Sequence, residues 1–147
     1  MFYLTFNKKR TLIILLAVNI VLFSFIALIT ANAFTQRLDS FRARKQYLED
    51  LGYTIDNNFT EEIRTIVLPT SFSKVYLNYN ELQKKNGFNL EKYKGFSVTQ
   101  YTLKVFDKSK RDDLYAHILL HNGRLIGGDI ATTAIDGYMK GLKNASW

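Results

Sequence analysis

The hydrophobic pattern of the chain begins with one continuous apolar segment. Residues 12–34 contain no charged side chain and directly follow the basic cluster Lys8, Lys9 and Arg10. At about 1.5 Å of rise per helical residue, this run reaches roughly 34 Å, which is enough to cross a hydrocarbon core of about 30 Å. The pattern predicts a transmembrane signal anchor over residues 11–34.

Two features bear on whether this segment is retained or removed. It is longer than the roughly 7 to 15 apolar residues of a usual signal-peptide core, which favours a retained anchor. The triplet Ala31–Asn32–Ala33 has the small residues that signal peptidases prefer, so cleavage after Ala33 and release of a secreted protein is the alternative. The basic cluster places residues 1–10 in the cytoplasm and the remainder of the chain outside the cell membrane.

Helical spacing continues beyond the apolar run and predicts a juxtamembrane helix within residues 35–52. Gly52 is expected to end this helix, because glycine readily adopts the left-handed conformation of a helix C-terminus. A short strand at 53–55 and a second strand at 63–68 follow, and Pro69 ends the second strand because proline cannot donate to a ladder. The apolar positions of the predicted helix are Leu38, Phe41, Leu48 and Leu51.

A second helix is expected to start at a cap formed by Thr70 or Ser71 and to end at Asn86–Gly87. One helical turn is expected at 90–93. The apolar positions of the second helix are Phe72, Val75, Tyr76, Tyr79 and Leu82.

The last third of the chain has the strand pattern of an antiparallel hairpin. A strand at 96–106 changes its apolar phase between Val98 and Tyr101, which predicts a bulge. The strands 114–121 and 124–131 are separated by Asn122–Gly123, the preferred pair for a type I′ turn. Gly127–Gly128 indicates a bulge or a close approach of other backbone. A short closing helix is expected at 135–142.

The order of these elements predicts an α+β fold. An N-terminal transmembrane helix precedes a small antiparallel sheet with helices packed on one face. The domain organisation is a cytoplasmic tail at 1–10, an anchor at 11–34, a juxtamembrane helix at 35–52 and an extracytoplasmic α+β domain at 53–147.

Composition narrows the classes of function. The chain has no cysteine, which excludes thiol enzymes, disulfide shuttles and cysteine-ligated metal sites. Aromatic residues make up 14%, too many for a disordered tail. The formal charge is +7, and the basic residues outside the N-terminal cluster are scattered. We therefore expect no nucleic-acid partner.

Few residues suggest chemistry. His117 and His121 share one face of a strand but lie roughly 13 Å apart at about 3.4 Å per residue, so they cannot hold one ion and no metal site or cofactor is predicted. Asp129 follows the two glycines and could bind a cation or a hydroxyl, or simply cap the strand. A glycosidase would need a second carboxylate beside it, and the candidates are Glu81, Glu91 and Asp136.

Tyrosines offer a second kind of site. Aromatic rings could form a surface that stacks on sugars or peptides, although tyrosines at helical spacing also fill cores with their hydroxyls at the rim. The residues are Tyr76, Tyr79, Tyr93 and Tyr101.

An ordered set of short segments between residues 47 and 142 resembles an uncharacterised family of Gram-positive bacteria, domain of unknown function 4830. The segments are YLEDLGY at 47–53, YNELQKKNGF at 79–88, LEKYKG at 90–95, IGGD at 126–129 and DGYM at 136–139. The resemblance implies a bacterial exported domain, often behind a membrane segment, and brings no catalytic residues. It implies that a set of residues matters to the domain, more to its fold than to chemistry: Tyr79, Asn80, Gly87, Gly95, Gly127, Gly128 and Asp129.

The leading hypothesis is a non-enzymatic interaction module, anchored in the membrane lipid and binding an envelope protein or a wall polymer. Its candidate binding residues are Asp129, Tyr79, Asn80 and Tyr93. One alternative is a cell-wall hydrolase with Asp129 as a catalytic acid; another is the secreted binding protein or inhibitor. Self-association through a free strand edge at 124–131 is a further possibility. The glycines expected to be structural are Gly52, Gly87, Gly95, Gly123, Gly127 and Gly128.

Overall fold

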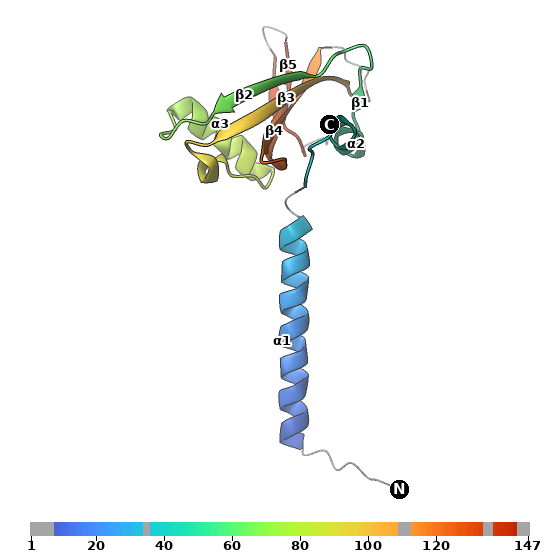
Figure 1. The fold of residues 1–147 in the computed structure, drawn as a ribbon, viewed down its shortest axis with the longest axis vertical. Coiled ribbons are helices and arrows are strands. Elements are labelled where there is room, and N and C mark those ends of the chain that lie inside the picture. Colours follow the sequence, from blue (N-terminus) through green and yellow to red (C-terminus); the bar gives the residue numbers. More distant parts are fainter. Residues whose placement is uncertain (1–7, 34–35, 109–112, 134–136, 144–147) are drawn as a thin grey trace. The chain divides into compact units, whose positions relative to one another are not determined.

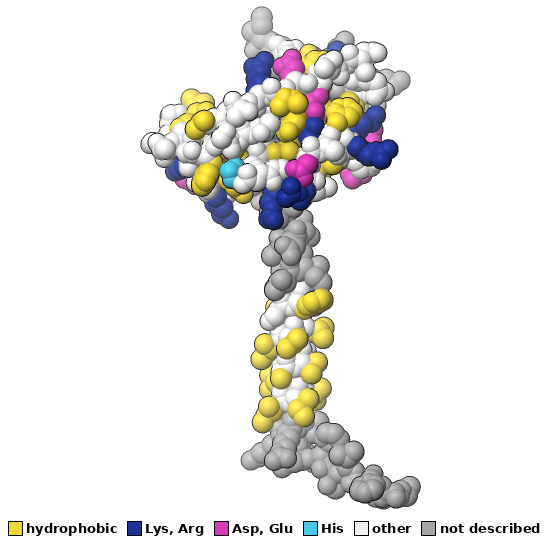
Figure 2. Space-filling view, in the orientation of Figure 1, with side chains coloured by type: hydrophobic (Ala, Val, Ile, Leu, Met, Phe, Trp, Pro, Cys, Tyr) yellow, Lys and Arg dark blue, Asp and Glu magenta, His cyan; other side chains and the backbone are white. Residues whose placement is uncertain are grey.

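The computed structural model describes residues 8–33, 36–108, 113–133 and 137–143. The chain divides into two compact units, Met1–Gln36 and Arg37–Trp147. The first contains one helix, α1 (Lys8–Ala33), whose described side chains are those of residues 13–25. These side chains are apolar apart from Asn19 and Ser24, which bond to carbonyls one turn earlier (Figure 2).

In the part of the chain that the structure describes, no helix is both long and apolar enough to cross a membrane.

The second unit is an α+β domain with one antiparallel sheet, as predicted (Figure 1). The strand order is β1–β3–β4–β5–β6, and β2 also pairs with β3, beyond the end of β1. The elements are α2 (Phe41–Asp50), β1 (Thr54–Ile55), β2 (Glu62–Val67), α3 (Lys74–Lys85), the 3-10 turn η1 (Leu90–Tyr93), β3 (Ser97–Phe106), β4 (Leu114–His121), β5 (Arg124–Thr132) and β6 (Met139–Gly141).

Helix α2 begins later than its hydrophobic spacing suggests. The Ser40 side chain accepts a hydrogen bond from the Ala43 N–H, so Ser40 is the N-cap. Leu38 therefore precedes the helix, although it is fully buried, and Phe41 is 46% exposed rather than part of the core. Gly52 has a φ of +92° and ends the segment, as predicted.

The buried side of α2 contains an arginine that the hydrophobic pattern does not reveal. Arg44 is 3% exposed and binds both carboxylate oxygens of Glu61, at 2.7 and 2.6 Å. It also donates to the carbonyls of Leu38 and Asp39, and its guanidinium lies 3.7 Å from the centre of the Tyr101 ring. The buried guanidinium charge of Arg44 is therefore compensated by the carboxylate of Glu61. These contacts join the start of the domain to the segment before β2.

Alternate residues of the strands supply two hydrophobic clusters. In β4, Ile118 belongs to the cluster that contains Leu48 of α2, and Leu119 belongs to the cluster against which Tyr79 of α3 packs. Because successive side chains of a strand point to opposite faces, α2 and α3 cover opposite faces of the sheet. The prediction that helices pack on one face is therefore wrong, and the two helices lie at opposite ends of the sheet in Figure 1.

The two clusters also explain the change of apolar phase in β3. Val98 packs in the cluster below α3, whereas Leu103 packs in the cluster of α2. The pairing of β3 runs without a shift along residues 97–102 with β2 and along residues 99–105 with β4, so the predicted bulge is absent from this described strand. The strand instead contributes Val98 to the cluster on one face of the sheet and Leu103 to the cluster on the opposite face.

The hairpin forms where the sequence predicts it. Asn122 and Gly123 have φ values of +50° and +74°, which fit a type I′ turn. The register shifts between Leu119 and Leu120, opposite an extra residue in β5. A Cβ on Gly128 would lie 2.3 Å from the His117 carbonyl oxygen, so the expected close approach is also present.

The C-terminal segment differs from the prediction. Residues 139–141 form strand β6, which pairs with residues 129–131 of β5, so the predicted helix at 135–142 is wrong there. Ile135 lies outside the described residues, and Leu142 is fully buried. Because β6 covers β5, the free edge expected at 124–131 is occupied over these residues.

Helix α3 buries two amide side chains, of which one bonds to the sheet. Its N-cap is Ser73 rather than Thr70 or Ser71, and its fully buried side chains are Asn80 and Gln83. The Gln83 amide donates to the Gly128 carbonyl (3.1 Å) and accepts from the Gly128 N–H (2.9 Å). It therefore pairs with β5 as a strand would, directly beyond the end of β6.

We predict that Gln83→Leu destabilises the domain by roughly 2 to 6 kcal/mol, because it leaves two buried main-chain groups of Gly128 without their partner. Urea unfolding followed by circular dichroism measures the change. Lys85→Leu, an exposed position on the same helix, is the control and should stay within about 0.5 kcal/mol of the parent. A Gln83→Leu variant as stable as the parent would show that the contact between Gln83 and Gly128 does not stabilise the domain.

Candidate functional site

Three side chains meet between α3 and the sheet. The Tyr79 hydroxyl donates to Asp129 Oδ1 at 2.6 Å, and His117 Nδ1 lies 2.9 Å from Asp129 Oδ2. Asp129 is 2% exposed, whereas the His117 side chain is 26% exposed. Both carboxylate oxygens are therefore engaged by residues of the same domain.

The sheet register and the helix period together place these residues. His117 in β4 and Asp129 in β5 are directly opposite each other, so their side chains share a face. Tyr79 is one helical turn before Gln83, and the two contact adjacent residues of β5. The hydrogen bonds between Gln83 and Gly128 thus determine the position of α3 along β5 and place the Tyr79 hydroxyl beside Asp129.

The environment of Tyr79 keeps its hydroxyl protonated. Burial, followed by the charge of Asp129 and the hydrogen bond to it, holds the pKa of Tyr79 well above its ordinary value of 10. Burial likewise raises the pKa of Tyr47 to about 12. The Tyr79 hydroxyl is therefore a hydrogen-bond donor throughout the physiological range of pH.

The cluster limits the chemistry that Asp129 can perform. The sequence suggested that Asp129 binds a cation or a hydroxyl of a ligand or caps the strand, and in the structure its carboxylate oxygens are bound by Tyr79 and His117 of the domain itself. Among the described residues, no group of three or more His, Cys, Asp or Glu side chains could hold a metal ion. Proton transfer by His117 would have to use Nε2, since Nδ1 faces the carboxylate.

The other candidate acids lie elsewhere. Glu81 and Glu91 both bind Lys84, at 2.9 and 3.2 Å, and Glu91 also binds Lys94. The hydrogen bond from Lys84 is the main cause that lowers the pKa of Glu91. Asp136 lies outside the described residues. The structure therefore gives Asp129 no second carboxylate from Glu81 or Glu91.

Asn80 joins α3 to the following turn. Its Oδ1 accepts from the Leu90 N–H at 2.7 Å, and its Nδ2 lies 3.3 Å from Glu91 Oε2. Since Asn80 is fully buried, its amide is occupied by the protein itself. Tyr93, another candidate binding residue, packs its ring 5.4 Å from that of His121, which bonds to the Ser97 carbonyl.

The four tyrosines do not form one surface. Tyr76, Tyr79 and Tyr93 pack against the cluster below α3, and Tyr101 packs against the cluster of α2. Because these clusters lie on opposite faces of the sheet, a single stacking platform of all four rings is ruled out.

A groove of about 400 Å³ lies over the ring of Tyr79, and the sequence did not reveal it. Its walls come from one side of α3 and from β6, which was expected to be a helix. Val75 is 76% exposed and Met139 50% exposed, so apolar surface faces solvent here. The lining residues are Val75, Tyr76, Asn78, Tyr79, Leu82 and Met139.

We predict that Tyr79→Phe destabilises the domain by about 1.5 to 3 kcal/mol at neutral pH, because it removes a buried hydrogen bond to a charged carboxylate. The raised pKa adds a signature at high pH. Above pH 10 the unfolded chain loses the Tyr79 proton while the folded chain keeps it, so stability falls by about 1.4 kcal/mol per pH unit for this residue.

Urea unfolding at a series of alkaline pH values should therefore give Tyr79→Phe a shallower decline than the parent. Leu77→Ala, on the same helix, removes no ionisable group and should keep the parent slope. Identical alkaline slopes for the parent and Tyr79→Phe would show that the Tyr79 proton is not bound more tightly in the folded state.

Comparison with known proteins gives one match. No curated protein and no solved structure matches the chain. The family described as domain of unknown function (DUF4830) matches residues 47–130, which include α3, the hairpin and Asp129. The chain therefore belongs to the DUF4830 family.

Proposed function

We propose that the chain is a membrane-anchored interaction module whose domain lies outside the cytoplasm and binds an apolar segment of another envelope protein in the groove of α3 and β6. The observation that carries this proposal is the groove itself, an exposed apolar hollow of about 400 Å³ beside the buried and already paired Asp129.

The proposal of an anchor rests on the uncharged run in the sequence, because no described helix meets the length and apolarity of a membrane span. Residues 12–34 contain no charged side chain, and a single helix runs through Lys8–Ala33. The described apolar side chains on it are solvent-exposed, for example Phe23 at 80%. Such a surface is stable in lipid rather than in water. The basic residues before it favour a cytoplasmic N-terminus.

We predict that a protease added to intact, wall-stripped cells digests the domain, and that mass spectrometry of the mature chain finds residues 1–33 still attached. A domain shielded from the protease would contradict an external location. A mature chain that lacks residues 1–33 would favour the secreted alternative, in which cleavage follows Ala33.

The lining of the groove favours a protein partner over a wall polymer. Val75, Leu82 and Met139 offer aliphatic surface, and none of the six lining residues is charged. A charged polymer would find no ion pair there, and a sugar would find few hydrogen-bonding groups. An aliphatic or aromatic side chain of a protein would bury apolar area at about 25 cal/mol per Å².

We predict that Val75→Lys lowers partner binding at least tenfold, because a lysine ammonium in an apolar contact loses its hydration without gaining a partner. A photo-crosslinking amino acid at position 75 of the full chain identifies the partner, and co-purification from detergent extracts measures the loss. Met139→Lys changes the opposite wall of the groove and should give the same result.

Leu77→Lys is the matched control, since Leu77 is 45% exposed on the same helix but does not line the groove. It should keep the parent level of partner. Equal loss with Leu77→Lys, or no loss with either groove variant, would rule out the groove as the binding surface.

The positions of the carboxylates give less support to the hydrolase alternative. A standard glycosidase holds two carboxylates about 5 to 9.5 Å apart across its substrate. Glu81 and Glu91 are instead bound to Lys84 on the outer side of α3. Asp129 is 2% exposed and engaged through both oxygens, which favours a structural part for this acid.

A further inference from the structure

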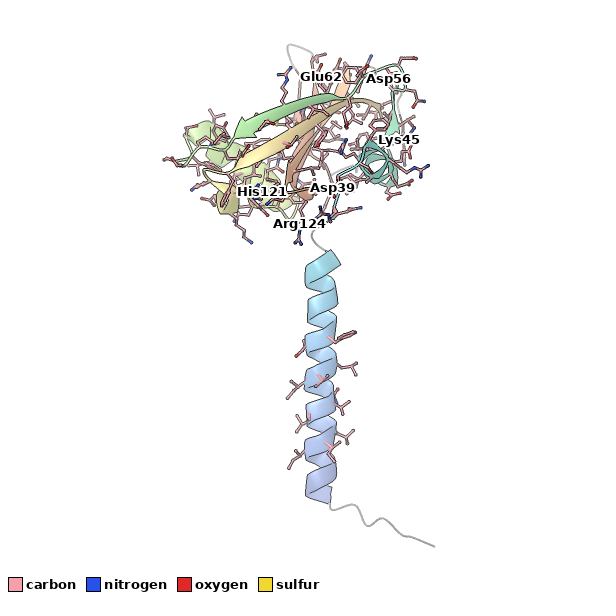
Figure 3. The ribbon with its side chains drawn as sticks, viewed as in Figure 1. Asp39, Lys45, Asp56, Glu62, His121 and Arg124 are labelled. Atoms are coloured by element: carbon pink, nitrogen blue, oxygen red, sulfur yellow. The ribbon has the colours of Figure 1, made fainter. Side chains whose placement is uncertain are left out.

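Strand β2 forms an edge of the sheet in the part of the chain that the structure describes. Among the described residues it pairs only with β3, so its outer main-chain N–H and C=O groups have no strand partner. In Figure 1 it runs beside β3, and Glu62, labelled in Figure 3, is its first residue. Its pairing with β3 is continuous from Glu62 to Val67, without a bulge that would turn the edge away.

The side chains of this edge alternate between an apolar and a charged face. Ile63 is 60% exposed and Val67 is 67% exposed, and both lie on the same face as Thr65. The charged face holds Glu62 and Arg64, which pair with each other at 3.2 Å, and at its end Ile66 is partly buried against the cluster below α3. Natural edge strands are usually covered, bulged or very short, and an exposed regular edge is a template for another strand.

We propose that β2 pairs antiparallel with β2 of a second copy of this chain, with Thr65 on the two-fold axis. A closed dimer needs a two-fold axis. In an antiparallel strand pair this axis lies midway between the two copies of one residue, which are directly opposite each other. With Thr65 on the axis, Ile63 of each copy faces Val67 of the other. The most exposed apolar side chains of β2 therefore cover each other.

Other symmetric registers are less favourable. With Arg64 on the axis, two guanidinium groups face each other, and like charges directly opposite are destabilising. With Ile63 or Ile66 on the axis, only three residues of each strand overlap. The Thr65 register pairs residues 63–67 of both copies and places no like charges directly opposite. The edge is thus self-complementary, which identifies a second copy as its partner.

The absence of cysteine from the chain allows a direct test. Single-cysteine variants of the full chain are placed in membranes and oxidised with copper phenanthroline, which accepts the two electrons as two thiols form a disulfide. Residues directly opposite have Cα atoms about 4.5 to 5.5 Å apart, within the range of about 4.4 to 6.8 Å for a disulfide. Thr65→Cys is expected to give a disulfide-linked dimer.

The neighbouring positions test the register. In the proposed pair the two copies of residue 63 are roughly 14 Å apart, since four residues at about 3.4 Å separate them along the strand. Ile63→Cys and Val67→Cys alone should therefore give no dimer, whereas a mixture of the two should give a crosslinked pair. Leu77→Cys, which is also exposed but lies on α3 outside the groove, is the control for random collision.

A further substitution separates pairing from proximity. Thr65→Lys places two ammonium groups across the axis and should lower the mixed crosslink between positions 63 and 67 at least tenfold. Circular dichroism verifies that each variant is folded. No Thr65→Cys dimer, or an equal yield from Leu77→Cys, would overturn the pairing of β2. A dimer from Ile63→Cys alone would overturn the Thr65 register.

Discussion

The contact between Gln83 and Gly128 determines how α3 is placed on the sheet. Strand β6 covers β5 only from Asp129 onward, so the adjacent N–H and C=O of Gly128 need another partner. The side-chain amide supplies one donor and one acceptor in the same geometry as a strand. Tyr79, one turn earlier, then reaches Asp129, and Asn86, one turn later, accepts from the Lys143 N–H. One polar stripe on α3 thus positions the acid, the groove and the end of the chain.

Features encoded within a few residues could be predicted from the sequence. The Asn122–Gly123 turn, the helix end at Gly52 and the turn at 90–93 depend on local conformational preference, and the structure contains all three. The alternation in β4 likewise identifies buried positions, because period-two patterns directly reflect the two faces of a sheet. The α+β class follows from these elements.

Features that depend on distant partners could not be predicted in this way. The apolar positions of α3 identified only part of its buried side. Tyr76 and Tyr79 do pack against a core cluster, but the fully buried Asn80 and Gln83 enter the interior because buried main-chain groups there need hydrogen-bond partners. The short strand β6 has too few residues for a clear period, and it forms because β5 offers an edge. Amides at helical spacing are the signal that could have revealed the stripe. The pairing of His117 with Asp129 required the hairpin register, which the turn already supplies.

The two proposed surfaces use different parts of the domain, and this separation has a consequence. Strands β3, β4 and β5 lie between β2 and β6 in the sheet order, so pairing through β2 leaves the groove beside Met139 accessible. A dimer would then present two identical grooves related by the axis at Thr65. When one segment of a two-segment partner is bound, the second segment is held near the other groove at a high effective concentration. The affinity of the pair then exceeds that of either contact, provided that the spacing of the grooves suits the partner. Dimerisation at one edge would in this way strengthen binding at the other without any new contact.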